Sequence, residues 1–377
     1  MFNTVDTLAT LAAFPSISSA PNEALIRYAA ERITAADGRL HTLAGALPGK
    51  FNLLASFGPA TGQGLVLSGH SDVVPVTGQD WHSDPFTLTE REGRLYARGA
   101  SDMKGFLAAM LTAAERAETR KLTRPLHLVF SYDEEIGCVG VRDLLARLQA
   151  EGFTAQGAVI GEPTGLRVIT GHKGKIGGCI CCRGRAAHSA NPALGCNAVA
   201  LAGEMLGEMA AMQAEFAETR RDDAYPFPHT SLHPGTIKGG VAVNIVPDFC
   251  EIGFEIRYLA GEDTGAILDR LRTKGTTLAA RNPGGTVEVV VTNEYPGVQT
   301  PEDAAITRAA LAAAGETTTG KIGFGTEAGL FAQALGLETV ICGPGSIDRA
   351  HKADEYVTRD ELAACDGFLD RLIATLY

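Results

Sequence analysis

Residues 65–75 read Leu-Val-Leu-Ser-Gly-His-Ser-Asp-Val-Val-Pro, and residues 98–105 read Arg-Gly-Ala-Ser-Asp-Met-Lys-Gly. The apolar start of the first stretch predicts a short buried strand that ends near His70, with Asp72 just beyond it. Asp102, in the second stretch, precedes an expected helix. Because ligands of α/β sheets gather where strands end, we expect one imidazole and two carboxylates to converge on a cleft. Such clusters bind metal.

Strand-like and helical segments alternate around this stretch. This alternation is typical of a mostly parallel sheet with helices on both faces, so the predicted fold class is α/β. A hairpin is expected at 86–96, and Asn22 is a plausible N-cap for the second helix. Strands are predicted at 51–57, 65–68, 126–131, 158–160 and 339–342, and helices at 5–14, 22–36, 103–118, 139–149 and 301–314.

The composition of the sequence and its pattern of expected elements change after residue 174. Glycines and a cysteine-rich strand are followed by helices near 197–220 and 264–280 and by strands near 231–237, 249–258 and 286–291. We therefore predict an inserted α+β domain at 176–292, within a first domain made of 1–175 and 293–377. A chain of 377 residues is long enough for two domains.

Composition narrows the class of partner. Hydrophobic residues make up 45% and charged residues 20%, which is typical of a soluble globular protein. The net charge of −11 disfavours nucleic acid and anionic membranes, so a small molecule is the expected partner. The N-terminus lacks the basic region of a secretory signal, and no apolar run could span a bilayer, so we expect a cytoplasmic location.

The eight cysteines show no zinc-ribbon or secreted-scaffold spacing, which predicts buried, reduced thiols. Cys179, Cys181 and Cys182 together as a soft-metal site are disfavoured, because strand alternation places Cys181 and Cys182 on opposite faces of a sheet.

Five side chains at expected strand ends or helix starts could bind a pair of divalent ions. Such ions take carboxylate and imidazole ligands, and a catalytic site leaves one position open for water. Two ions that share one carboxylate can activate a water and polarise a scissile carbonyl. The set comprises His70, Asp102, Glu135, Glu162 and His351.

Two further acids have distinct predicted roles. Glu134 stands beside a ligand, where an unligated carboxylate can act as a general base. Asp72, two residues after His70, can accept the other ring N–H of that imidazole and so fix its tautomer.

Six segments then carry a resemblance over nearly the whole chain. They are Ser-Gly-His-Ser-Asp-Val-Val-Pro (68–75), Arg-Gly-Ala-Ser-Asp-Met-Lys-Gly (98–105), Asp-Glu-Glu (133–135), Gly-Glu-Pro-Thr (161–164), Gly-Arg-Ala-Ala-His-Ser (184–189) and Gly-Pro-Gly-Ser-Ile-Asp-Arg-Ala-His-Lys-Ala-Asp-Glu-Tyr (343–356). In this order they resemble the acetylornithine deacetylase / succinyl-diaminopimelate desuccinylase family of dinuclear zinc amidohydrolases. Each motif alone is weak, but the ordered set is specific.

The resemblance implies a zinc-exopeptidase-like fold with two Zn²⁺ ions, with Co²⁺ as the alternative metal. By it, His70, Asp102 and Glu162 hold one ion, and Asp102, Glu135 and His351 hold the other. It also implies that Glu134 is the general base, that Asp72 orients His70, and that the Asp102–Met103 peptide bond is cis.

The inserted block resembles the family's lid, which carries the interface of a homodimer. The resemblance implies that His188 steadies the oxyanion, in its own subunit or its partner's, and that Asn244 and Arg257 hold substrate. A guanidinium suits the α-carboxylate of an acylated amino acid. Thr326 and Lys173 are weaker matches to substrate-binding positions.

Within the family, residues 84–90 and 343–356 most resemble members that convert N2-acetyl-L-ornithine to L-ornithine and acetate in arginine biosynthesis. A desuccinylase, a broader N-acyl-amino-acid deacylase and a non-catalytic ligand-binding paralogue stay open. Glu355 could meet a basic side chain or be a solvated loop acid. Ser101-x-x-Lys104 matches a serine acyl-transfer signature, but its companion motifs are absent.

Overall fold

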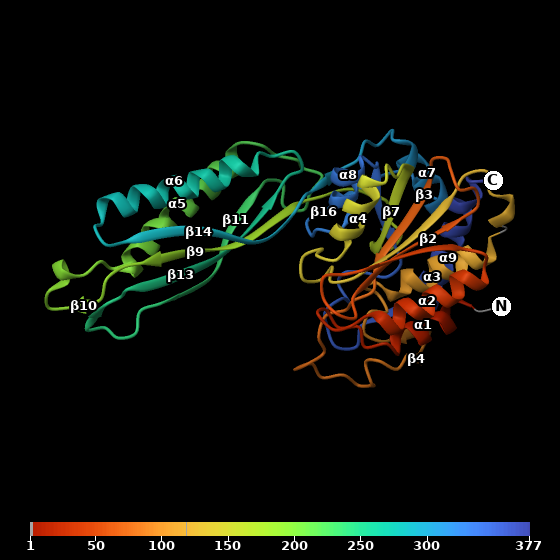
Figure 1. Ribbon diagram of the computed structural model, residues 1–377, viewed down its shortest axis with the longest axis horizontal. Coiled ribbons are helices and arrows are strands. Elements are labelled where there is room, and N and C mark those ends of the chain that lie inside the picture. Colours follow the sequence, from red (N-terminus) through yellow and green to blue (C-terminus); the bar gives the residue numbers. More distant parts are fainter. Residues whose placement is uncertain (1–2, 118) are drawn as a thin grey trace. The chain divides into compact units, whose positions relative to one another are not determined.

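The computed structural model describes residues 3–117 and 119–377. It divides into two compact units (Figure 1). The first contains the chain up to Gly171 together with Val298–Lys321 and Thr326–Tyr377, and the second contains His172–Gly297 and Ile322–Gly325. The second unit thus begins four residues before the predicted insertion and also takes a short segment from 293–377.

The first unit is built on a nine-stranded mixed sheet. Its neighbouring strands β6, β3, β7 and β17 run parallel, so their carboxyl ends lie at one edge of the sheet. The α/β fold class is therefore confirmed. In sheet order the strands are β1 (Arg39–Ala44), β2 (Phe51–Phe57), β6 (Leu126–Ser131), β3 (Gly64–His70), β7 (Ala155–Pro163), β17 (Thr339–Gly343), β8 (Ile169–His172) and β15 (Val298–Gln299), and β16 (Gly320–Ile322) pairs with β8.

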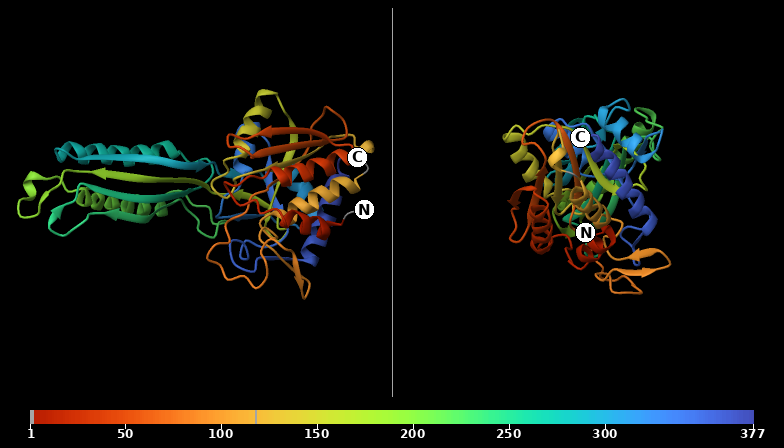
Figure 2. Two further views of the ribbon diagram at one scale, coloured as in Figure 1. Left: turned by 60° about the horizontal axis from the view of Figure 1, so that its bottom comes forward. Right: turned by 90° about the vertical axis from the view of Figure 1, so that its right-hand side faces the viewer.

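Helices cover both faces of this sheet (Figure 2). Strand β3 is buried along its whole length. Leu65 and Leu67 join the core under one layer of helices, and burial of each leucine contributes about 2 kcal/mol. That layer consists of α1 (Thr4–Ala12), α2 (Glu23–Ala35), α3 (Lys104–Arg116), α7 (Ala305–Ala314) and α9 (Arg359–Ala374). The opposite layer consists of α4 (Val141–Ala150) and α8 (Ala328–Leu335).

A small sheet closes one side of the first unit. The predicted hairpin is present as β4 (Thr89–Arg91) and β5 (Arg94–Tyr96), and β18 (Tyr356–Thr358) pairs with β5. This pairing brings the segment after β17 back beside residues 97–102.

Asn22 stands at the predicted N-cap position of α2, but its side chain makes no capping hydrogen bond. Its amide donates to the carbonyl of Phe51 and to the hydroxyl of Ser71, each at 2.9 Å, so it ties the start of α2 to the sheet instead.

The second unit is a four-stranded antiparallel sheet with two helices on one face. The order is β11 (Ser231–Gly239), β13 (Phe249–Tyr258), β9 (Gly174–Arg183) and β14 (Thr286–Tyr295), and the helices are α5 (Ala198–Glu218) and α6 (Thr264–Arg281). Ile180, Cys182 and Ile252 point into the core beneath the helices. Among the described residues of this unit, no helix packs on the other face.

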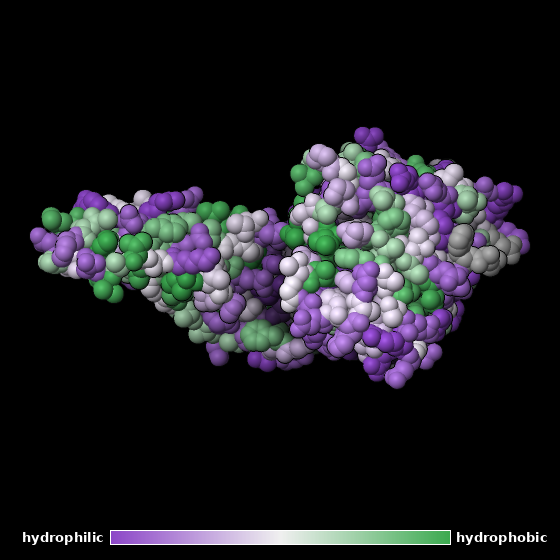
Figure 3. Space-filling view, turned by 90° about the horizontal axis from the view of Figure 1, so that it is seen from below, coloured by the Kyte–Doolittle hydropathy of each residue, from purple (hydrophilic) through white to green (hydrophobic). Residues whose placement is uncertain are grey.

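Apolar side chains are exposed in the second unit near β12 (Ile245–Val246), which pairs with β10 (Ala187–His188). The most exposed are Val241 and Val243, at 83% and 103%. Figure 3 shows hydrophobic patches on the surface of this unit. In the described part of the chain, no helix has the length and apolar character needed to cross a membrane.

Candidate metal centre

The five predicted ligands come from the carboxyl ends of the parallel strands and from one helix start. His70 is the last residue of β3, Glu135 follows β6, Glu162 lies near the end of β7, and His351 follows β17. Asp102 lies two residues before the start of α3, and its peptide bond to Met103 is cis. The parallel order of the strands therefore explains why residues far apart in sequence meet.

These side chains lie within ligand-sharing distance of one another. Asp102 lies between the two imidazoles, with Oδ1 3.0 Å from His70 Nε2 and Oδ2 3.3 Å from His351 Nε2. Glu162 Oε1 is 3.9 Å from His70 Nε2, and Glu135 Oε2 is 3.0 Å from His351 Nε2. The two carboxylate oxygens of Asp102 therefore face different imidazoles, one that of His70 and the other that of His351.

The chemistry of this donor set fits divalent cations. Buried carboxylates converge here, and among the described residues Glu135 Oε1 is buried without a hydrogen-bond partner. His70, Glu134 and Glu162 form one group of possible ligand atoms within 4.8 Å of one another, and His70, Asp102 and Glu135 form another. Closely spaced carboxylates without countercharge repel one another, and a cation removes that repulsion.

The pKa directions reflect the same crowding. Burial raises the pKa of Glu162 well above its usual range, and nearby Asp102 adds to the effect. Burial alone would also raise the pKa of Asp102, but hydrogen bonds to His351 and His70 outweigh it and lower that pKa. Hydrogen bonds to Asp102 and to Glu135 raise the pKa of His351 to about 10. Protons on the imidazoles thus balance the carboxylates here, and metal binding releases such protons.

Glu134 lies beside the cluster. It is half-buried, and its partial removal from water raises its pKa to about 8. The thiol of Cys138 donates to its Oε1 at 3.3 Å. Glu134 therefore has the position predicted for a general base, next to the ligands.

Asp72 contacts both the imidazole and the segment that carries Glu134. The ring Nδ1 of His70 lies 2.9 Å from the main-chain oxygen of Asp72 and 3.5 Å from its Oδ1. The carboxylate accepts the main-chain N–H of Glu134 at 3.0 Å and the hydroxyl of Ser18 at 2.7 Å. Asp72 thus offers two acceptors near Nδ1, and the shorter contact is from its carbonyl.

The sequence left open whether Glu355 meets a basic side chain or is a solvated loop acid. It is buried and pairs with Arg98 Nη1 at 2.6 Å, so it does meet a basic side chain, which belongs to this chain itself. Its Oε1 accepts the main-chain N–H groups of Ser101 at 2.9 Å and Asp102 at 3.0 Å. No periodicity marked this residue, because its partners come from a distant loop.

Glu327 was also missed. It is buried, and burial raises its pKa to about 7. Within the described residues, neither of its carboxyl oxygens has a hydrogen-bond partner in good geometry. Its neighbour Thr326, predicted to bind substrate, is buried and accepts the N–H of Ala328 at 3.0 Å, as a helix-capping side chain does.

The remaining predicted substrate residues lie in the second unit. His188 is exposed and lies opposite Ile245 in the pairing of β10 with β12. The main-chain carbonyl of Asn244 accepts the N–H of Ser189 at 3.0 Å, so His188 and Asn244 lie close together. Arg257 donates to Glu255 at 2.6 Å and to the Tyr295 hydroxyl at 2.9 Å.

Lys173 is buried rather than a surface charge, as is Lys104 in the first unit. The ammonium of Lys173 donates to the carbonyl of His229 and lies 4.9 Å from the ring centre of Phe227. Lys104 donates to the carbonyl of Phe14 at 2.7 Å, and the Ser101 hydroxyl contacts Ser346. Ser101 and Lys104 are therefore committed to other partners than each other.

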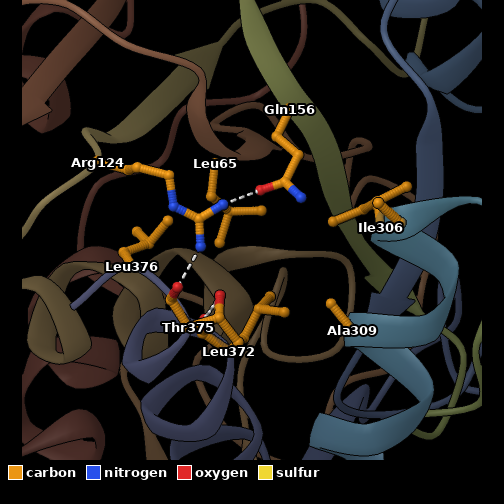
Figure 4. A pocket seen from close by; sticks show the side chains of 9 residues that line it. Leu65, Arg124, Gln156, Ile306, Ala309, Leu372, Thr375 and Leu376 are labelled. Atoms are coloured by element: carbon orange, nitrogen blue, oxygen red, sulfur yellow. Dashed lines mark hydrogen bonds between the residues drawn. The ribbon is translucent and has the colours of Figure 1, made fainter.

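Figure 4 shows a small pocket in the first unit. Leu65 and Gln156 line it, and they stand at the amino ends of β3 and β7, opposite to the ligands. Arg124 bridges it by donating to Gln156 and to the carbonyl of Thr375. The pocket is thus separate from the candidate metal centre.

Relatives of this chain include proteins named acetylornithine deacetylase. It is 37% identical over 309 residues to acetylornithine deacetylase of Proteus mirabilis (strain HI4320), which covers 82% of this chain and 78% of that protein. It is 36% identical over 374 residues to acetylornithine deacetylase of Myxococcus xanthus, which covers 98% and 96%.

Solved structures share the fold. The M20 family metallo-carboxypeptidase Sso-CP2 from Sulfolobus solfataricus matches with a TM-score of 0.79 at 19% identity, over 99% of both chains. The Bacillus subtilis YXEP protein, a dinuclear metal-binding peptidase from the M20 family, matches with a TM-score of 0.72 at 14% identity, over 99% of this chain and 97% of that one. The family model for peptidase family M20/M25/M40 matches residues 66–375. The resemblance carried by the six sequence segments is thereby confirmed, and the chain belongs to peptidase family M20/M25/M40.

Proposed function

We propose that this hydrolase removes the acetyl group from N2-acetyl-L-ornithine and releases L-ornithine and acetate. The observation that carries the proposal is the meeting of five metal-ligand side chains at one sheet edge, with Glu134 beside them. The relatives named acetylornithine deacetylase support the substrate.

The ligand assignment is the one that the family resemblance implies, and the short distances between the side chains support it. His70, Asp102 and Glu162 would hold one Zn²⁺, and Asp102, Glu135 and His351 would hold the other, with Asp102 shared. When bound, such a pair supplies an activated water and polarises the amide carbonyl. Carboxylate and imidazole ligands suit zinc and also cobalt, so metal analysis of the purified protein decides between the two.

Glu134 performs the proton transfers. It accepts a proton from the water whose oxygen attacks the amide carbon, and it delivers a proton to the nitrogen as the C–N bond breaks. The hydrogen bond that the main-chain N–H of Glu134 donates to the Asp72 carboxylate holds the backbone of Glu134 in place during both transfers. Acetate keeps the oxygen of the water, and the amine leaves neutral.

Residues of the second unit complete the proposal. His188 and Asn244, which lie close together, would contact the oxyanion and the substrate. Arg257 would bind the α-carboxylate by exchanging part of its pairing with Glu255, with Lys173 and Thr326 as weaker contributors. A homodimer through this unit is supported by its exposed valines, because contiguous exposed apolar surface marks interaction sites.

One comparison tests the proposal. We expect Glu134→Gln to retain both metal ions but to lose at least about a hundredfold in kcat, in line with the usual contribution of a general base. Glu31→Gln, on the exposed face of α2, is the matched control and should keep full activity. Metal retention with normal turnover in Glu134→Gln would refute the role of Glu134.

A substrate panel tests the specificity. Hydrolysis of N-acetyl-ornithine should exceed that of N-acetyl-citrulline, N-acetyl-methionine and N-succinyl-diaminopimelate. Faster turnover of the succinyl substrate would reassign the activity to a desuccinylase, and turnover of none would favour a ligand-binding role. Cell fractionation would check the predicted cytoplasmic location.

A further inference from the structure

A second group of metal-ligating side chains lies on the helix-free face of the sheet in the second unit. Cys179 and Cys181 come from β9, and Glu251 and Glu288 come from the two strands on either side of it. Cys181 is directly opposite Glu251 on β13 and directly opposite Glu288 on β14. Side chains that are opposite one another in antiparallel strands share a face and touch.

Alternation along β9 explains which thiols belong to the group. Cys182 points into the core beneath the helices, so it is excluded, as the sequence indicated. Cys179 and Cys181 are two residues apart and therefore share the opposite face. They are also the only two of the eight cysteines that are part-exposed, since the other six are buried.

The distances among three of the four side chains, Cys179, Cys181 and Glu251, are close to those of a tetrahedral site. Cys179 Sγ and Cys181 Sγ are 3.7 Å apart, and Cys181 Sγ is 3.9 Å from Glu251 Oε2. Zinc–sulfur bonds of about 2.3 Å and zinc–oxygen bonds of about 2.1 Å at tetrahedral angles require separations of roughly 3.8 Å and 3.6 Å. The thiols are already at the required spacing, and a small rotation of Glu251 closes the remaining gap.

The local charge also favours a cation. Burial raises the pKa of Cys181 to about 11, and Cys179, Glu251 and Glu288 add to the effect. Without a bound cation, these surroundings therefore disfavour the thiolate forms of the two cysteines. A thiophilic cation would stabilise the two thiolates and the two carboxylates together.

We propose that Cys179, Cys181, Glu251 and Glu288 form a further metal site, selective for a thiophilic divalent cation of the Zn²⁺ type. On binding, the two thiols lose their protons to solvent, and two thiolates and two carboxylates coordinate the ion. The ion then links three adjacent strands of the sheet. The site is independent of the catalytic pair, which has no thiolate ligand.

Cobalt is the probe that separates this site from the catalytic one. Thiolate-bound Co²⁺ gives an intense near-ultraviolet charge-transfer band that carboxylate and imidazole ligands do not give. We expect reduced, metal-free wild-type protein to develop this band and to bind three ions. The double variant Cys179→Ser/Cys181→Ser should bind two ions without the band and should still hydrolyse substrate.

A control addresses the thiol nearest the catalytic cluster. Cys138→Ser removes the thiol that contacts Glu134, and it should keep the band. Absence of the band in wild type, its persistence in the double serine variant, or its loss only in Cys138→Ser would overturn the proposal.

Thiol titration gives an independent readout. With Ellman's reagent, metal-free native protein should show two reactive thiols, and Zn²⁺ should protect both. Glu251→Gln and Glu288→Gln should each weaken this protection by at least about tenfold in Zn²⁺ concentration, in the range expected when a metal site is impaired. Equal reactivity with and without Zn²⁺ would overturn the proposal. So would thiols that react only after a reductant is added, because they would then form a disulfide.

Discussion

Replacement of Glu355 by glutamine should weaken the metal centre without touching any ligand. The buried carboxylate holds the loop that presents Asp102, because one of its oxygens accepts the N–H groups of Ser101 and Asp102. The other oxygen accepts Arg98 Nη1 at 2.6 Å and the N–H of Gly99 at 3.1 Å. An amide of the same shape can satisfy one pair of donors, but its NH₂ group then faces the other pair.

The magnitude follows from burial. The side chains of Arg98 and Glu355 are each 1% exposed, so Glu355→Gln leaves a buried guanidinium without its counterion. Loss of one partner of a buried pair costs about 3–5 kcal/mol of stability. Partners that orient metal ligands typically contribute roughly 10–100-fold in affinity, so we expect a loss of that size for the ions bound by Asp102.

Two measurements and two controls test this prediction. Denaturant unfolding of metal-free protein reports the stability, and competition with a fluorescent chelator reports the affinity. Glu90→Gln removes an exposed pairing with Arg359 and should change neither. Arg98→Met/Glu355→Gln should recover part of the stability, because no buried guanidinium then lacks its counterion. The affinity should stay below that of wild type, because the amide still turns its NH₂ group toward some of the loop N–H groups. A Glu355→Gln variant with the stability and metal affinity of wild type would refute the reasoning.

Three further predictions concern stability. Burial lowers the pKa of His127 to about 4, so the unfolded chain, with a pKa near 6.5, takes up the proton first as pH falls. Between pH 7 and pH 5, the free energy of unfolding measured in urea should therefore fall by about 2 kcal/mol more for wild type than for His127→Gln. An identical pH dependence of the two proteins would contradict this. The buried ammonium of Lys50 lies 2.5 Å from Asp133, and Asp133→Asn removes its counterion. This change should lower the free energy of unfolding by about 3 kcal/mol in the same assay. An unchanged urea midpoint would count against the prediction. Removal of metal by a chelator should lower the melting temperature, and Zn²⁺ at about 1,000 times its Kd should restore about 4 kcal/mol; a melting curve insensitive to both would show that no ion supports the fold.

The sequence predicted those parts of the site that depend on local pattern. Apolar runs marked β3, β6, β7 and β17, and parallel order then required that their carboxyl ends meet. This is why His70, Glu135 and Glu162 could be grouped before any coordinates. Asp102 was found in the same way, because it precedes a strongly helical segment.

The sequence did not predict those contacts of the fold and the site that depend on loop closure and on strand register. Arg98 and Glu355 are 257 residues apart and meet only because β18 pairs with β5. Alternation excluded Cys182 from the cysteine group, but only register shows that Cys181 has a glutamate on each side. The side chain of Asn22 likewise found partners in the sheet that no local pattern indicated.

The contacts of Asp72 have a consequence for how this centre can change. One carboxylate group lies near a ligand imidazole and also fixes the backbone of the residue assigned to proton transfer. Metal preference and proton-transfer geometry therefore cannot be adjusted separately by substitutions at this position. An engineer who wishes to alter one property without the other should leave Asp72 intact and work from the outer partner, the hydroxyl of Ser18.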